Sequence, residues 1–170
     1  MIDYFLPVSI TLGLITWGLV ARWYILPWMN GQTLGDALTP LLLMNVLRYV
    51  GLAFLIPGVT DQVLDDRFAA PAAWGDLAAA LLALLALVAL HRNWKTAGTV
   101  VWIFNVFGAA DLINAVLQGL RYTVDGHLGA TYFIPALFVP ILFVAHVVIG
   151  VVQLQHRTRQ RPVDELSPTN

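Results

Sequence analysis

Two charged side chains stand inside long apolar stretches of this sequence. Arg48 lies at the centre of LLLMNVLRYVGLAFLIPG, and Asp111 lies within WIFNVFGAADLINAVLQG. A charge at the centre of a bilayer costs about 2.5–3.5 kcal/mol on insertion scales, so such residues usually face a protein interior and have a partner. Both residues lie near the middle of their stretches, and the two stretches run in the same direction if every apolar segment crosses. We therefore expect Arg48 and Asp111 to share a depth and to pair.

Other polar residues recur at helical spacing around this level. Asn45 stands three residues before Arg48 and shares its helix face. An aromatic and three polar residues follow one another at i, i+4, i+7 and i+11: Phe107, Asp111, Asn114 and Gln118. His146 falls at a depth close to that of Asn45, in a stripe with Gly150 and Gln153. The predicted ligand-binding set is Arg48, Asp111, Asn45, His146, Asn114 and Phe107.

The same residues would also allow acid–base chemistry. Asp111 and His146 could share a proton transfer, while Arg48 could stabilise an anion; Asp111 and His146 are the catalytic candidates. A metal site needs several ligands at one depth, and the other histidines lie at segment ends or in the tail: His91, His127 and His156. The chain has no cysteine. We therefore expect no metal and no cofactor.

The composition indicates lipid as the main surroundings of these residues. The chain of 170 residues is 59% hydrophobic and 11% charged, whereas soluble domains are about 45–50% apolar and about 25% charged. Nine Lys and Arg stand against ten Asp and Glu, and without a basic excess we expect no nucleic-acid partner. The sequence predicts an all-α integral membrane protein whose partners are membrane lipids.

Five segments reach the length of about 20 residues that a membrane-spanning helix needs. They are residues 4–24, 37–59, 68–90, 97–120 and 128–154. The sequence thus predicts one domain over residues 1–155, a bundle of five transmembrane helices. Residues 156–170 are polar and contain two prolines, which predicts a disordered tail.

The distribution of Lys and Arg predicts the orientation, because cytoplasmic loops carry an excess of them. Six lie on one side if all five segments cross: Arg22, Arg92, Lys95, Arg157, Arg159 and Arg161. Arg67 and Arg121 lie on the other side. We expect the C-terminus in the cytoplasm and the N-terminus outside, in the cytoplasmic (inner) membrane of a bacterium.

Two segments suggest how the bundle is arranged. Residues 77–90 contain only Leu, Ala and Val, so we expect this helix on the outside of the bundle, or against a second copy in a homo-oligomer. The other four segments would then form the core. Pro135 and Pro140 predict either a simple bend in the last helix or a cavity in the outer half. The aromatic residues expected to line that cavity are Tyr132, Phe133 and Phe138.

Three functions fit these features. The first is binding or transport of a small amphipathic or anionic molecule at the Arg48–Asp111 level. The second is an intramembrane acid–base enzyme that acts on a lipid-soluble substrate. The third is a structural or accessory membrane subunit whose polar core only specifies packing.

Overall fold

The computed structural model describes residues 4–60, 64–122 and 127–160. This part of the chain is all-helical, and five stretches are long and apolar enough to cross a membrane. They are Phe5–Met29, Leu34–Leu55, Asp66–His91, Ala97–Arg121 and Gly129–His156. All five predicted segments are therefore largely helical; the first continues to Met29, and the second ends at Leu55 instead of residue 59.

Three of the five stretches change helix type along their length. The first consists of α1 (Phe5–Val20), the π-helix η1 (Ala21–Ile25) and α2 (Leu26–Met29). The second consists of α3 (Leu34–Val46) and the 3₁₀ helix η2 (Leu47–Leu55). The last consists of the 3₁₀ helix η4 (Gly129–Tyr132), the π-helix η5 (Ile134–Phe138) and α6 (Val139–Gln160). α4 (Asp66–His91) and α5 (Ala97–Arg121) are α-helical throughout.

Polar side chains cap two of the helices. The Thr33 hydroxyl accepts a hydrogen bond from the Asp36 N–H at 3.2 Å where α3 begins. Asp65 caps α4 and accepts from the Arg67 N–H at 2.9 Å. The Arg67 side chain also donates to Asp65, and this lowers the pKa of the Asp65 carboxyl to about 2. Asp65 is therefore ionised at any physiological pH.

α4 packs into the bundle along one face. It packs against α3, η2 and α5, and it does so through a stripe of buried alanines: Ala69, Ala72, Ala73, Ala79, Ala80, Ala83, Ala86 and Ala89. Small residues let helices approach closely in a membrane. The expectation that residues 77–90 lie outside is wrong, because the alanines face inward while Leu81, Leu84 and Leu85 face outward.

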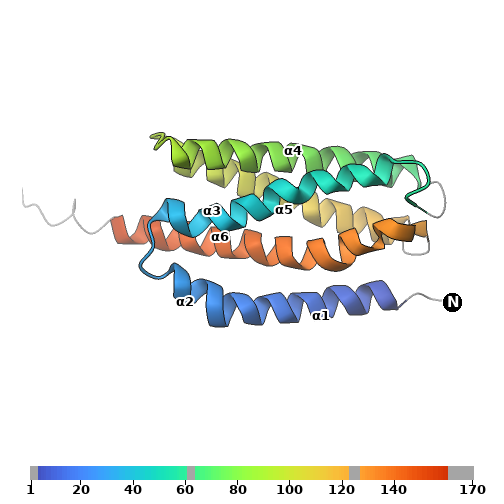
Figure 1. Cartoon of the computed structure of the whole chain (residues 1–170), viewed down its shortest axis with the longest axis horizontal. Helices are drawn as coiled ribbons and strands as arrows, with labels where there is room; N and C mark the ends of the chain where they lie inside the picture. The colour runs from blue at the N-terminus through green and yellow to red at the C-terminus, as the bar shows by residue number, and fades with distance from the viewer. Residues whose placement is uncertain (1–3, 61–63, 123–126, 161–170) are drawn as a thin grey trace, which may run out of the picture.

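α1 takes the peripheral place instead. None of its residues is buried, and it lies along α6 at the edge of the bundle in Figure 1. Gly13 allows this approach, since a Cβ there would stand 2.7 Å from Pro140 Cγ. The Ser9 hydroxyl and the Tyr132 hydroxyl form a hydrogen bond of 3.0 Å. We expected the first helix to be one of four helices that form the core. The structure places it at the edge of the bundle instead.

Two apolar clusters fill the interior. The larger one contains Leu38, Leu42, Phe104 and Ile149, and the smaller one contains Phe54, Phe68 and Leu128. On their own helices, Arg48 and Asp76 each lie between residues of the larger cluster and residues of the smaller one. α6 ends at Gln160, within the segment predicted as a disordered tail, and residues 161–170 lie outside the described part.

Candidate functional site

The 3₁₀ helix η2 positions the arginine. Its nine residues exceed the three or four that are usual for a 3₁₀ helix. With three residues per turn, side chains at i and i+3 lie directly above one another. The three buried residues of η2 have this spacing: Arg48, Gly51 and Phe54. The 3₁₀ geometry thus places Arg48 on one stripe with the other two buried residues of η2. η2 itself packs on α4.

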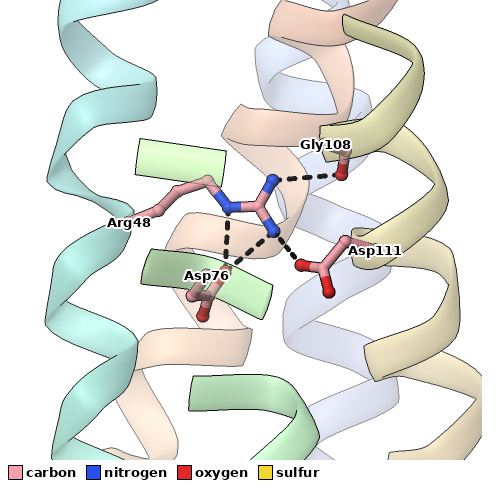
Figure 2. A network of polar contacts seen from close by, with 4 residues as sticks. All are labelled: Arg48, Asp76, Gly108 and Asp111. Carbon is pink, nitrogen blue, oxygen red and sulfur yellow. Dashed lines mark hydrogen bonds and ion pairs between the residues drawn. The ribbon is translucent and has the colours of Figure 1, made fainter. Parts of the chain in front are cut away.

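The Arg48 guanidinium connects three partners (Figure 2). Nε donates to Asp76 Oδ1 at 2.8 Å, and Nη2 lies 2.8 Å from the same oxygen. Nη2 also donates to Asp111 Oδ2 at 2.6 Å, and Nη1 donates to the Gly108 carbonyl oxygen at 3.0 Å. The structure therefore has the expected contact between Arg48 and Asp111. It adds Asp76, from α4, as a second carboxylate.

The sequence held a signal for Asp76. It lies within about one helical turn of the middle of the predicted segment 68–90, which is the criterion that singled out Asp111. Asp76 was not among the predicted site residues, because we expected this segment to lie outside the bundle.

Three glycines make room for this charge cluster, which we define as Arg48, Asp76 and Asp111. A Cβ on Gly51 would collide with Asp76, and a Cβ on Gly75 would collide with Asp111. A Cβ on Gly108 would stand 2.6 Å from His146 Cε1 and 3.2 Å from Arg48 Nη1. Each helix therefore carries its glycine where a neighbouring helix contributes a polar side chain.

In the charge cluster Arg48 is buried and the two aspartates are partly buried, and the cluster has two acidic groups and one basic group. The side-chain exposed fractions are 0% for Arg48, 17% for Asp76 and 11% for Asp111. Every nitrogen of the guanidinium is already hydrogen-bonded to the chain. Arg48 is thus engaged, while two carboxylates share its single charge. A site of this kind favours a cation over an anion.

His146 lies next to this cluster but binds elsewhere. Its Nδ1 forms a hydrogen bond of 2.8 Å with Asn105 Oδ1, and its ring packs on Phe104 with the centroids 5.3 Å apart. The two catalytic candidates therefore have different partners, Arg48 for Asp111 and Asn105 for His146. Asn105 was not among the predicted site residues, although it is buried.

The remaining predicted site residues divide between interior and surface. Asn45 is buried, and its Nδ2 donates to the Leu41 carbonyl oxygen at 2.9 Å. Phe107 and Asn114 are exposed. The buried face of α5 contains Phe104, Asn105, Gly108 and Leu112. Asp111 lies at the margin of this face, and the rest of the predicted stripe therefore points away from the charge cluster.

An apolar cavity of about 290 Å³ lies on the opposite side of the charge cluster from His146. α1, α4, α5 and the η5 region all contribute to its wall, among them Ile10, Phe68, Leu112, Ala115 and Pro135. Asp76 also lines it and supplies a carboxylate. Other residues in its wall are Leu6, Pro7, Thr11, Phe54, Ala72, Val116, Gly119, Leu120, Leu128, Ile134 and Val139.

A cavity therefore lies beside Pro135, with a different lining from the one expected. Pro140 packs close to Gly13 of α1 instead. Phe133 is exposed, the Tyr132 hydroxyl bonds to Ser9, and Phe138 lines a separate space of about 20 Å³ beside Arg48. Pro135 and its neighbours Ile134 and Val139 take the place of these aromatics.

The family model described as Domain of unknown function (DUF8737) matches residues 5–154. The match includes the charge cluster and the cavity, and the chain belongs to this family. No curated protein and no solved structure matches the chain.

Proposed function

We propose that this member of DUF8737 binds, and carries across a membrane, a small amphipathic molecule with one positive charge. The apolar body of the molecule would occupy the cavity of about 290 Å³, and its cationic group would meet Asp76. Ligand pockets for small molecules are typically apolar, with a few polar groups that fix the orientation. The observation that carries the proposal is the position of Asp76 in an otherwise apolar wall.

The geometry of Asp76 supports a cationic group. Both contacts from Arg48 reach Oδ1, so Oδ2 accepts neither of them, as Figure 2 shows. A cation beside Oδ2 would complement the second carboxylate of the charge cluster. The anionic ligand that the sequence also suggested has less support, because the Arg48 nitrogens already have partners.

We further propose that the five helices span the cytoplasmic membrane of a bacterium with the C-terminal end of α6 inside. The connection between α4 and α5 contains Arg92 and Lys95 and lies at the same end of the bundle as α2 (Figure 1). Arg22 lies in η1, which leads into α2. Arg67 and Arg121 lie at the other end, where both guanidinium groups stand over the Tyr122 ring. The cavity would then occupy the outer half.

Binding by the purified full chain in detergent tests the proposal. The probes are 4-phenylbutylammonium, 4-phenylbutanol and 4-phenylbutanoate, which share an apolar body and differ in charge. We expect saturable binding by calorimetry in the order cation, alcohol, anion. An anion that binds best would contradict the proposal.

Two variants locate the site. Asp76→Asn should lose the preference for the cation, and Ala115→Phe should fill the cavity and weaken all three probes. Asp66→Asn is the matched control, because Asp66 is exposed at the start of α4. Uptake of labelled 4-phenylbutylammonium into proteoliposomes then separates transport from binding alone.

A further inference from the structure

The interior between α5 and α6 is polar on the other side of the charge cluster. His146, Gly150 and Gln153 form one stripe on α6, and the two polar side chains are 4% and 3% exposed. Both reach α5, where His146 binds Asn105 and Gln153 Nε2 donates to the Gly98 carbonyl oxygen at 3.0 Å. Gly150 lies between them, and a Cβ there would stand 3.6 Å from Asn105 Nδ2. A polar row thus continues along the α5–α6 seam.

Three buried polar atoms at this level and beyond have no hydrogen-bond partner within the described residues: Asn45 Oδ1, His146 Nε2 and Gln153 Oε1. Buried polar groups are nearly always hydrogen-bonded, and ordered water commonly provides the missing bond. Ordered water is therefore the expected partner of these three atoms. His127 Nδ1, next to Leu128 of the cavity wall, also has no partner within the described residues. The half of the bundle that contains the cavity of about 290 Å³ differs, since the wall of this cavity is largely apolar.

The polar row connects two places. At one end, His146 Nε2 and Arg48 Nη1 both lie within 3.2 Å of the position that a Cβ on Gly108 would take. At the other end, Gln153 and Gly98 line a groove of about 820 Å³ together with Lys95 and His156. The row therefore leads from the C-terminal end of the bundle to the charge cluster.

We propose that this row, defined by Gln153, Asn105 and His146, conducts protons between the groove and the charge cluster. Because Asn105 Oδ1 can only accept, its bond to His146 places the hydrogen on Nδ1 and leaves the Nε2 lone pair on the side of Gly108. Water along the row carries a hydronium ion past Asn105 to the Gly108 side of His146, where Nε2 takes the proton and leaves a water molecule. The imidazolium then gives this proton, through water, to a carboxylate of Asp76 or Asp111, and His146 is neutral again.

The charged and titratable groups around this destination come from four elements. They are Arg48 from η2, Asp76 from α4, Asp111 from α5 and His146 from α6. α1 contributes Thr11 and apolar side chains to the cavity wall. A proton that enters compensates the second carboxylate of the charge cluster, with or without any other ligand.

A pH jump on the purified full chain, without ligand, tests the route. The infrared band of protonated carboxyl groups reports proton uptake, and its loss in Asp76→Asn or Asp111→Asn assigns it to the charge cluster. We expect His146→Gln, which keeps a hydrogen-bonding side chain, to slow uptake by about a hundredfold, the lower end of what a positioned proton-transfer group contributes. The amplitude at equilibrium should stay the same.

Matched controls and a second variant complete the experiment. Gln153→Leu should also slow uptake, whereas His91→Gln and Gln118→Leu, both outside the row, should leave the rate unchanged. Equal rates in the wild type, His146→Gln and Gln153→Leu would overturn the route, and so would a cluster that takes up no proton. The result does not depend on the proposed ligand, so the two proposals succeed or fail separately.

Discussion

Arg48 pairs with two carboxylates, and this changes what its removal should do. Breaking a buried ion pair by removing one partner costs about 3–5 kcal/mol. Arg48→Leu leaves Asp76 and Asp111 uncompensated, and we expect a loss of this size in the free energy of unfolding. Asp111→Asn leaves the contacts between Arg48 and Asp76, so we expect a smaller loss of about 1–3 kcal/mol.

Unfolding of each variant in mixed micelles measures both losses. Adding Asp111→Leu to Arg48→Leu should recover only part of the stability, because Asp76 stays buried without its partner. Full recovery in that double variant would mean that Asp76 contributes nothing to the pairing.

Gly108 offers a second test of the charge cluster. A methyl group there would stand 2.6 Å from His146 Cε1, and overpacking of this kind costs about 1–3 kcal/mol. Gly98, on the same helix, has open space around it. Gly98→Ala should therefore be neutral or stabilising by up to about 1 kcal/mol. The comparison uses the same unfolding measurement, and equal effects at the two positions would refute the tight fit at Gly108.

Some of this residue-scale detail was predictable. The depth of Arg48 and Asp111 in their apolar segments predicted a contact that the structure has. The glycines beside it carried no signal, since a glycine in an apolar helix has the same appearance whether a neighbour's carboxylate or lipid lies against it. Phe107 and Asn114 were predicted to face the site because their spacing puts them on one helix face with Asp111. Asp111 lies at the margin of the buried face, so Phe107 and Asn114 are exposed.

At the scale of helices, the sequence predicted the five long apolar helices of the described residues but misplaced two of them. In a membrane, outward and inward residues are both apolar, so hydrophobicity does not tell a central helix from a peripheral one. Small residues do, because close helix packing depends on them. Most alanines of α4 are buried, whereas Leu81, Leu84 and Leu85 are exposed. The absence of polar residues from residues 77–90 did not indicate a peripheral helix.

α4 therefore gives a prediction about its two faces. Ala83 is fully buried, and Ala83→Leu should destabilise the protein by about 1–3 kcal/mol through overpacking. Leu84, the next residue, is 48% exposed, and Leu84→Ala should change stability far less. The same unfolding assay compares the two variants. If Ala83→Leu did not destabilise the protein, α4 would not be tightly packed through this face.

The change of helix type in η2 was beyond sequence reasoning. Arg48, Gly51 and Phe54 are spaced at three, but residues at i and i+3 share a face in an α-helix as well. The two geometries differ in their backbone hydrogen bonds, which join residues three apart in a 3₁₀ helix and four apart in an α-helix. The side-chain pattern is the same in both.

At the scale of the whole molecule, the orientation can be tested cleanly because the chain contains no cysteine. Arg121→Cys and Lys95→Cys place single thiols at opposite ends of the bundle, both at exposed positions. A membrane-impermeant maleimide should label Arg121→Cys in intact cells, and Lys95→Cys only after permeabilisation. The reverse pattern would overturn the proposed orientation.

The excess of one carboxylate links ligand and proton across the bundle. One cation or one proton neutralises the charge cluster, and both together would leave a surplus positive charge beside an apolar cavity, so the two should compete. Binding of 4-phenylbutylammonium should then release about one proton, and its affinity should rise by up to about tenfold per pH unit while the charge cluster holds that proton. Asp65 would not contribute, since its pKa lies at about 2. Calorimetry in buffers of different ionisation enthalpy measures the release, with Asp66→Asn as the control. Affinity that is independent of pH, with no proton released, would mean that the cation binds without displacing a proton from Asp76 and Asp111.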